Sequence, residues 1–99
     1  MKFENKVCVI TGGANGIGLC IAREFAKEGS KVAIVDMDQS AGEQALAYIR
    51  AYGSEGLFYC GDIAEKATIE RFANEVIETY GRIDYLINNA CGAVFESFQ

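Results

Sequence analysis

A chain of 99 residues, 51% of them hydrophobic and 23% charged, has room for a single core and the composition of an ordinary globular domain. Its net charge of −5 argues against nucleic acid or an anionic membrane surface as the main partner. No apolar run approaches the roughly 20 residues that span a bilayer, and the first residues lack the pattern of a signal peptide. We therefore expect a cytoplasmic protein with neither nucleic acid nor membrane among its partners.

The hydrophobic patterns predict strands and helices in strict alternation. Strands are expected at residues 7–11, 31–36, 56–60 and 83–88, and helices at 17–28, at 41–52 after a cap at Asp38 or Ser40, and at 69–80. Gly29, Gly53 and Gly81 follow the three helices and predict their ends. This order indicates an α/β fold: a doubly wound parallel sheet in strand order 3-2-1-4, with three helices on its two faces.

The residue types exclude several kinds of site. The four cysteines, Cys8, Cys20, Cys60 and Cys91, form no Cys-x-x-Cys pair, and without histidine the usual zinc ligand sets are missing. We expect no metal, and no Cys–His or Ser–His–Asp catalysis within these residues. Cys8 and Cys60 lie in apolar strand-like runs, which predicts reduced thiols acting as small buried hydrophobic residues.

The stretch TGGANGIG, residues 11–18, joins the first predicted strand to the first predicted helix. A helix N-terminus binds phosphate when the backbone before it is thin and can adopt positive φ. Gly12 is expected to make the tight turn, Gly16 to admit a pyrophosphate, and Gly18 to let the helix pack on the strand. The side chain of Asn15 either binds a hydroxyl or phosphate group of a bound cofactor or holds the loop in its conformation. An ordinary tight turn also uses glycine. The residues around the loop are therefore needed to distinguish a phosphate-binding loop from such a turn.

Asp36 at the end of the second strand favours a phosphate-binding loop, because it follows Gly16 by 20 positions. A carboxylate at this separation is expected to bind a ribose 2′-hydroxyl and to repel a phosphate there. Neither Asn15 nor Met37 is a basic residue that could offset the repulsion. NAD is therefore favoured over NADP, the alternative being that Asp36 merely caps a helix.

Two further residues follow the third strand. Asp62 is placed where a carboxylate can accept a hydrogen bond from the adenine amino group, and Ile63 where it can pack on the ring. An aspartate after a strand is also a common turn residue, so this assignment depends on the other residues.

The combination of TGGANGIG, Asp36, Gly61-Asp62-Ile63 and Asn88-Asn89-Ala90 resembles the N-terminal half of a short-chain dehydrogenase/reductase over essentially the whole chain. The resemblance implies a Rossmann fold that binds a dinucleotide, with hydride exchange between nicotinamide and an alcohol or carbonyl. The cofactor-binding residues that it implies are Gly12, Asn15, Gly16, Ile17, Gly18, Asp36, Asp62, Ile63, Asn89 and Ala90.

Two neighbouring positions are treated separately. In the family, Asn88 mainly ties adjacent strands together, and Thr11 is its expected partner here. The family usually has glycine after Asn-Asn-Ala, where this chain has Cys91. A cysteine is small enough for that position, although the local turn can shift by a residue; the alternative is a reactive thiol in the crevice.

The resemblance also implies catalytic residues that these 99 residues lack. The family uses a serine, a Tyr-x-x-x-Lys pair and a further asparagine, all downstream of Asn-Asn-Ala. None of the five tyrosines has a lysine four positions later. We therefore expect residues 1–99 to form part of a dinucleotide-binding domain with no catalytic residue, the catalytic half being absent from the sequence.

Three functions remain open at this point. The first is the N-terminal portion of an NAD-dependent short-chain oxidoreductase. The second is a stand-alone nucleotide-binding or interaction module without turnover, and the third, which fits less well, is a Rossmann-like methyltransferase. In strand order 3-2-1-4 the fourth strand becomes an exposed edge, so self-association through that strand or the sheet face is also expected.

Overall fold

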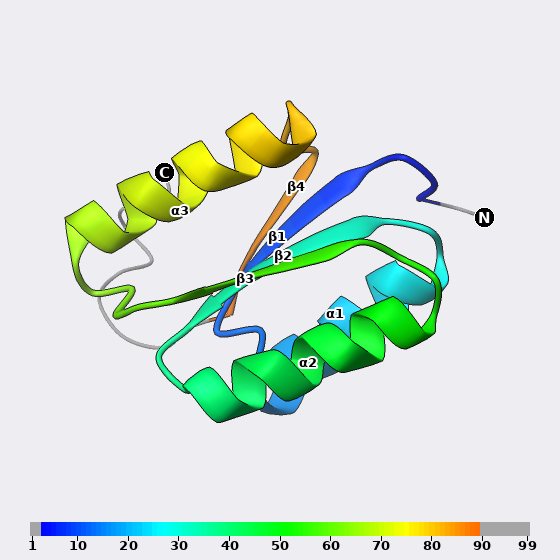
Figure 1. Cartoon of the computed structure of the whole chain (residues 1–99), viewed down its shortest axis with the longest axis horizontal. Helices are drawn as coiled ribbons and strands as arrows, with labels where there is room; N and C mark the ends of the chain where they lie inside the picture. The colour runs from blue at the N-terminus through cyan, green and yellow to red at the C-terminus, as the bar shows by residue number, and fades with distance from the viewer. Residues whose placement is uncertain (1–2, 90–99) are drawn as a thin grey trace.

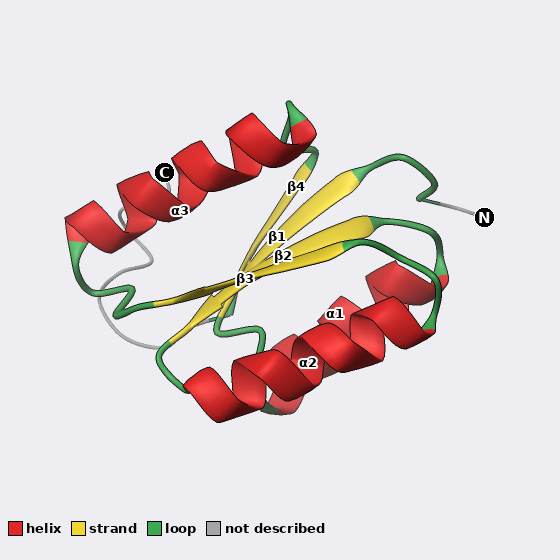
Figure 2. Cartoon of the chain, in the orientation of Figure 1, coloured by secondary structure: helices red, strands yellow, loops and turns green. Residues whose placement is uncertain are grey.

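A computed structural model describes residues 3–89, which form one parallel sheet between two layers of helices (Figures 1 and 2). The elements in chain order are β1 (Val7–Thr11), α1 (Gly16–Lys27), β2 (Lys31–Asp36), α2 (Gln39–Ala51), β3 (Gly56–Cys60), α3 (Lys66–Tyr80) and β4 (Tyr85–Asn88). The strand order is β3-β2-β1-β4, and every pairing is parallel. The predicted fold class and strand order are confirmed.

The central strands β1 and β2 are buried on both faces, which explains their unbroken apolar sequences. Side chains alternate along a strand, so each strand contributes to two separate cores. The core between the sheet and the α1–α2 layer contains Cys8, Ile10, Val32, Ile34, Ala22, Ala26, Ala45 and Ile49. The core beneath α3 contains Val7, Val9, Ala33, Val35, Phe72 and Val76. Figure 2 shows the two helical layers on opposite faces of the sheet.

The ends of the helices follow from local chemistry. The α2 helix begins after Asp38, whose carboxylate accepts a hydrogen bond from the backbone N–H of Ala41 at 3.0 Å. The α3 helix ends at Gly81, which has a φ of 79° and donates its N–H to the carbonyl oxygen of Ile77. Of the two caps considered for the second helix, Asp38 is the one that the structure uses.

The expected burial is wrong at one cysteine. Cys60 is exposed, whereas Cys8 is fully buried. The reason is tertiary: β3 is an outer strand of the sheet, and Cys60 is its last residue. Burial raises the pKa of the Cys8 thiol to about 12, so this cysteine stays a neutral core residue at physiological pH.

The last strand differs from the apolar stretch 83–88 in length and burial. It begins at Tyr85, and its only hydrogen-bonded neighbour among residues 3–89 is β1. Leu86 is 45% exposed although it lies in register with the buried Val9. Ile77 on α3 is 46% exposed although it follows the helical apolar pattern. The β4 edge and the adjoining side of α3 are thus uncovered in the described part of the chain.

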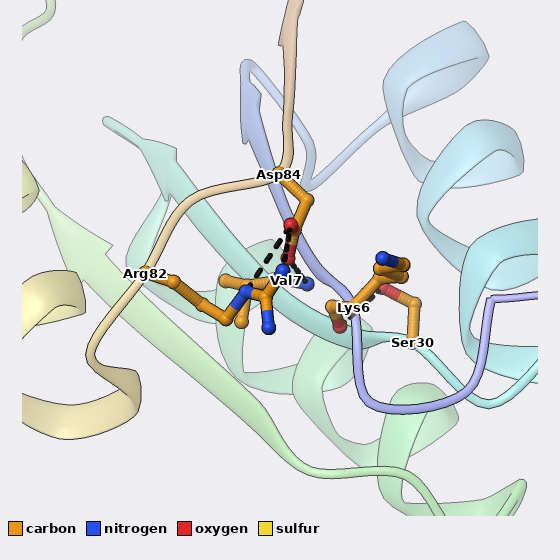
Figure 3. Close-up of polar contacts among 5 residues, drawn as sticks. All are labelled: Lys6, Val7, Ser30, Arg82 and Asp84. Atoms are coloured by element: carbon orange, nitrogen blue, oxygen red, sulfur yellow. Dashed lines mark hydrogen bonds and ion pairs between the residues drawn. The ribbon is translucent and has the colours of Figure 1, made fainter.

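The amino ends of three strands are joined by a group of polar contacts (Figure 3). One carboxylate oxygen of Asp84 accepts the N–H of Val7 at 2.8 Å, and the N–H of Asp84 is donated to the carbonyl oxygen of Val7 at 2.9 Å. Arg82 approaches the other carboxylate oxygen at 2.6 Å. The hydroxyl of the fully buried Ser30 lies 3.1 Å from the carbonyl oxygen of Lys6. These contacts fix where β1, β2 and β4 begin.

The Asp84 contacts predict a pH-dependent stability. Arg82 and the N–H of Val7 hold the pKa of Asp84 below its ordinary value of 3.8. A lowered folded-state pKa stabilises the folded protein above the ordinary pKa, and this stabilisation is lost as the pH falls through the lowered value. We expect Asp84→Asn to reduce the melting temperature by a few degrees at pH 7 and progressively less as the pH falls below 3.8, as measured by circular dichroism.

The matched control for this change is Glu24→Gln. It removes the ion pair between Glu24 and Lys27, both of which are largely exposed, so a change of less than one degree is expected. A loss of stability from Asp84→Asn that does not shrink as the pH falls from 7 to below 3.8 would contradict the electrostatic origin of the effect.

Candidate dinucleotide-binding site

The predicted site residues converge at the carboxyl ends of the strands. Parallel strands present these ends at one edge of the sheet, and the strand order reverses between β1 and β4. That reversal is the position at which open α/β sheets bind ligands. The described residues of the site belong to the glycine loop after β1, the turns after β2 and β3, and Asn89 after β4.

The glycine loop turns sharply away from the sheet. Gly12 has a φ of 70°, and its N–H donates to the carbonyl oxygen of Val35 at 2.8 Å. Gly13 packs so closely on β2 that an added Cβ would overlap the side chain of Ile34. Gly13 had no predicted role, because spacing alone does not show which glycine lies against the sheet.

The first turn of α1 is exposed, and no side chain of the described residues covers its N-terminal end. Gly16 has a φ of 57°, and no heavy atom outside its immediate surroundings lies within 4 Å of the position a Cβ would take. Asn15 is the N-cap residue, yet its side chain makes no capping hydrogen bond. The next residue, Ile17, is 72% exposed. The N–H groups of the first turn are therefore not occupied by a side-chain cap and suit an anionic group such as phosphate.

Gly18 has the opposite environment. A Cβ at this position would overlap the carbonyl group of Gly12 and lie 2.6 Å from the side-chain nitrogen of Asn89. The glycine is thus required because α1, the loop and the residue after β4 meet there. This arrangement agrees with the predicted packing role of Gly18.

A small polar network joins β1 to β4 at the base of the loop. The Thr11 hydroxyl donates to the side-chain oxygen of Asn88 at 2.9 Å and accepts the N–H of Asn89 at 3.1 Å. The side-chain amide of Asn89 donates to the carbonyl oxygen of Gly12 at 3.1 Å. The expected structural pairing of Asn88 with Thr11 is confirmed. Asn89 follows β4 where the strand order reverses, and its amide supports the glycine loop.

Asp36 is half-buried beside the loop and makes two hydrogen bonds with backbone N–H groups. One carboxylate oxygen accepts from Ala14 at 3.2 Å, and the other accepts from Asp38 at 3.1 Å. Because Asp38 is the N-cap residue of α2, the alternative role of Asp36 as the helix cap is not what the structure shows. Ala14 was not identified from sequence, since the contact uses its backbone and leaves no side-chain signal.

The turn after β3 carries the two remaining described candidates. The Asp62 carboxylate accepts the N–H of Ala64 at 2.9 Å, so the residue forms an aspartate turn of the common kind. Ile63 is half-buried and packs against the core beneath α3. Gly61 in the same turn donates its N–H to the carbonyl oxygen of Asp36 at 3.0 Å, which places this turn next to the one after β2. The predicted adenine contacts remain predictions.

Two positions singled out in the sequence lie outside the described residues. Ala90 and Cys91 are not among residues 3–89. Within that range, no group of three acidic, cysteine or histidine side chains is arranged to hold a metal ion. None of the helices there is both long and apolar enough to cross a bilayer.

The parallel sheet, its strand order and the helices on both of its faces define an α/β protein of the Rossmann type. The sequence model of the short chain dehydrogenase family matches residues 6–99. The chain therefore belongs to that family, which is an oxidoreductase family.

Relatives with assigned names agree with this placement. The chain is 42% identical over 90 residues to an uncharacterized oxidoreductase of Thermotoga maritima, covering 91% of this chain and 35% of that protein. It is 38% identical to the meso-2,3-butanediol dehydrogenase of Serratia marcescens, covering 98% of this chain and 39% of that enzyme. The chain thus spans little more than a third of the length of these relatives.

Solved structures show the same fold. The chain is similar to an NAD+-bound xylitol dehydrogenase with a TM-score of 0.89 and 37% identity, covering 93% of this chain and 35% of that one. It is also similar to a glucose dehydrogenase of Caenorhabditis elegans in its apo form, with a TM-score of 0.87 and 30% identity. That second match covers 97% of this chain and 42% of the other.

The two glycines of α1 are expected to respond differently to alanine. Gly16→Ala forces an L-residue into positive φ, at a cost of about 1 kcal/mol, and fills the open space where a phosphate would lie. Gly18→Ala causes overlap with backbone and is expected to cost about 2–3 kcal/mol. Urea denaturation measures the stabilities, and titration with ADP measures binding. We expect Gly16→Ala to weaken ADP binding more than tenfold.

Gly53→Ala is the matched control for backbone strain. Gly53 has a φ of 84° with open space around it, but it follows α2 at the opposite end of the sheet. It should lose about as much stability as Gly16→Ala while ADP binding stays unchanged. Equal effects of Gly16→Ala and Gly53→Ala on ADP affinity would contradict the assignment of the anion site.

Proposed function

We propose that this chain supplies the adenosine and pyrophosphate part of an NAD(H) site in a short-chain oxidoreductase. Such an enzyme transfers hydride between nicotinamide and an alcohol or carbonyl compound. The observation that carries the proposal is the pair formed by the uncapped, glycine-bordered N-terminus of α1 and the carboxylate of Asp36 beside it. An anion-binding backbone and a hydroxyl-binding carboxylate are the two features that an adenosine diphosphate group needs.

The preference for NAD over NADP rests on charge. A 2′-phosphate on the ribose would meet the Asp36 carboxylate, and the neighbouring residues Asn15 and Met37 carry no positive charge to compensate. The relative crystallised with NAD+ has the same overall backbone arrangement, which supports this cofactor. The bound cofactor would supply the hydride chemistry, while Asp36 orients the ribose and the glycine loop holds the phosphates.

Turnover is proposed to need residues beyond these 99. None of the tyrosines in the chain belongs to a Tyr-x-x-x-Lys pair, so the chain by itself is expected to bind the cofactor without reducing or oxidising a substrate. The relatives named for butanediol and xylitol support an alcohol or its carbonyl product as the substrate class.

Replacing Asp36 tests the cofactor preference. We expect Asp36→Ala to weaken NAD binding about tenfold, through loss of a charge-assisted hydrogen bond to the ribose. NADP binding should change much less, because the same substitution removes the repulsion of its 2′-phosphate. Isothermal titration calorimetry with each cofactor measures the ratio of affinities. Asp38→Ala removes an equal charge nearby and is the control, and an unchanged NAD-to-NADP ratio in Asp36→Ala would rule out the proposed role.

We also propose that the 99-residue chain self-associates through β4 and the adjoining sheet face. Leu86, Ile83 and Ile77 are 45%, 39% and 46% exposed, and β4 has an unpaired edge within the described residues. An exposed strand edge bordered by apolar side chains is a surface on which another strand can pair.

The oligomeric state tests this proposal. Leu86→Lys places a charge on the apolar edge and should raise the dissociation constant of self-association at least fivefold, in favour of the monomer. Met37→Lys adds the same charge at another exposed apolar residue, 66% exposed after β2, and should leave the association unchanged. Sedimentation velocity measures both. A monodisperse wild-type monomer at tens of micromolar would refute self-association.

A further inference from the structure

Asp36 is in contact with all three turns that follow β1, β2 and β3. Its carboxylate accepts the N–H of Ala14 in the glycine loop and the N–H of Asp38 in the turn to α2. Its carbonyl oxygen accepts the N–H of Gly61 in the turn after β3. Segments far apart in the sequence are therefore held together by one residue.

The contact with Ala14 is the one that matters for the glycine loop. Ala14 is 1% exposed, so its N–H is removed from water and requires an acceptor inside the protein. The acceptor is the side-chain carboxylate of Asp36 at the end of β2, 22 residues along the chain. Hydrogen bonds to charged groups are stronger than those between neutral groups, and leaving a buried N–H without its acceptor is costly.

From these contacts we infer that Asp36 is a positioning residue for phosphate binding as well as a ribose ligand. This inference rests on the proposed function, because it concerns the same cofactor. By holding the N–H of Ala14, Asp36 fixes the loop whose next residues, Asn15 and Gly16, begin the open end of α1. The two halves of the adenosine diphosphate site are thereby coupled through one carboxylate.

The two roles are compatible at a single carboxylate. An ionised carboxylate has about four acceptor sites on its two oxygens. The N–H groups of Ala14 and Asp38 use one site on each oxygen. The remaining sites can accept two ribose hydroxyls without displacing either backbone contact.

The charge of Asp36 by itself has the opposite effect on phosphate. A carboxylate close to the anion site repels the ligand, so removing it should strengthen binding of a pure phosphate probe. Fixing the loop predicts that removal weakens the same binding. The sign of the change therefore separates a positioning role from a purely electrostatic one.

The experiment titrates the full chain with inorganic pyrophosphate and, separately, with adenosine, following backbone amide shifts by NMR. Asp36→Ala is expected to weaken pyrophosphate binding about fivefold, although this probe contains no ribose. Asp36→Asn keeps one oxygen that can accept from Ala14 and removes the repelling charge, so it should bind pyrophosphate as well as wild type or better. Asp38→Ala removes a charge of the same sign without touching the loop, and should bind pyrophosphate as well as wild type or better.

Amide exchange supplies a second readout that needs no ligand. Exchange of the Ala14 N–H should accelerate about tenfold in Asp36→Ala and stay near the wild-type rate in Asp38→Ala and Asp36→Asn. Unchanged exchange in a folded Asp36→Ala, or pyrophosphate binding equal to or tighter than wild type, would overturn the inference. If Asp36→Ala does not fold, Asp36→Val, which also lacks an acceptor oxygen, is tested by the same two readouts, and the same two results would overturn the inference.

The outcomes also separate this inference from the proposed function. If the wild-type chain bound neither adenosine nor NAD, the proposed function would fail, while Ala14 exchange would still decide the positioning role. If adenosine and NAD bound to the wild-type chain, but Asp36→Ala changed neither pyrophosphate binding nor Ala14 exchange, the proposed cofactor site would stand without the positioning role.

Discussion

The abrupt end of the buried strand β1 is the constraint on which the rest of the structure depends. The strand is hydrogen-bonded on both sides and covered on both faces. The chain therefore has to leave the sheet directly after Thr11 without leaving backbone polar groups unpaired. Gly12 makes the turn with positive φ, and its N–H and carbonyl oxygen are bound by Val35 and Asn89. The direction of α1, and with it the open helix N-terminus, follows from this turn.

Much of the fold follows from the sequence because its signals are local. The apolar runs, helical spacing and helix-ending glycines give the alternation of elements, and the chirality of parallel crossovers leaves few strand orders to consider. The position of the glycine loop opposite Asp36 then follows from parallel strands presenting their carboxyl ends at one edge. The pairing of Asn88 with Thr11 came from the resemblance to the short-chain dehydrogenase family, in which that asparagine ties adjacent strands together.

The features that were not anticipated depend on tertiary surroundings. Cys60 lies in an apolar strand like Cys8, but only the sheet order shows that its strand is at an edge. Ile77 has the pattern of a buried residue and is exposed because no described segment covers it, whereas the exposed edge at Leu86 was expected from the strand order. The bond from Ala14 to Asp36 uses a backbone N–H, which has no sequence signature at all. Pattern analysis identifies elements and candidate ligands better than it identifies what holds them in place.

The two ends of the sheet use polar groups for different purposes. At the amino ends, Asp84 binds the N–H of Val7, and the Ser30 hydroxyl lies within hydrogen-bond distance of the carbonyl oxygen of Lys31, so the hydrogen-bonding capacity of these first strand residues is used for folding. At the carboxyl ends, the loop is equally well supported, but the N-cap side chain of α1 leaves the first turn uncapped. No buried side-chain polar atom of the described residues lacks a partner. The uncapped N–H groups at the start of α1 are donors that a bound anion, rather than the protein, would complete.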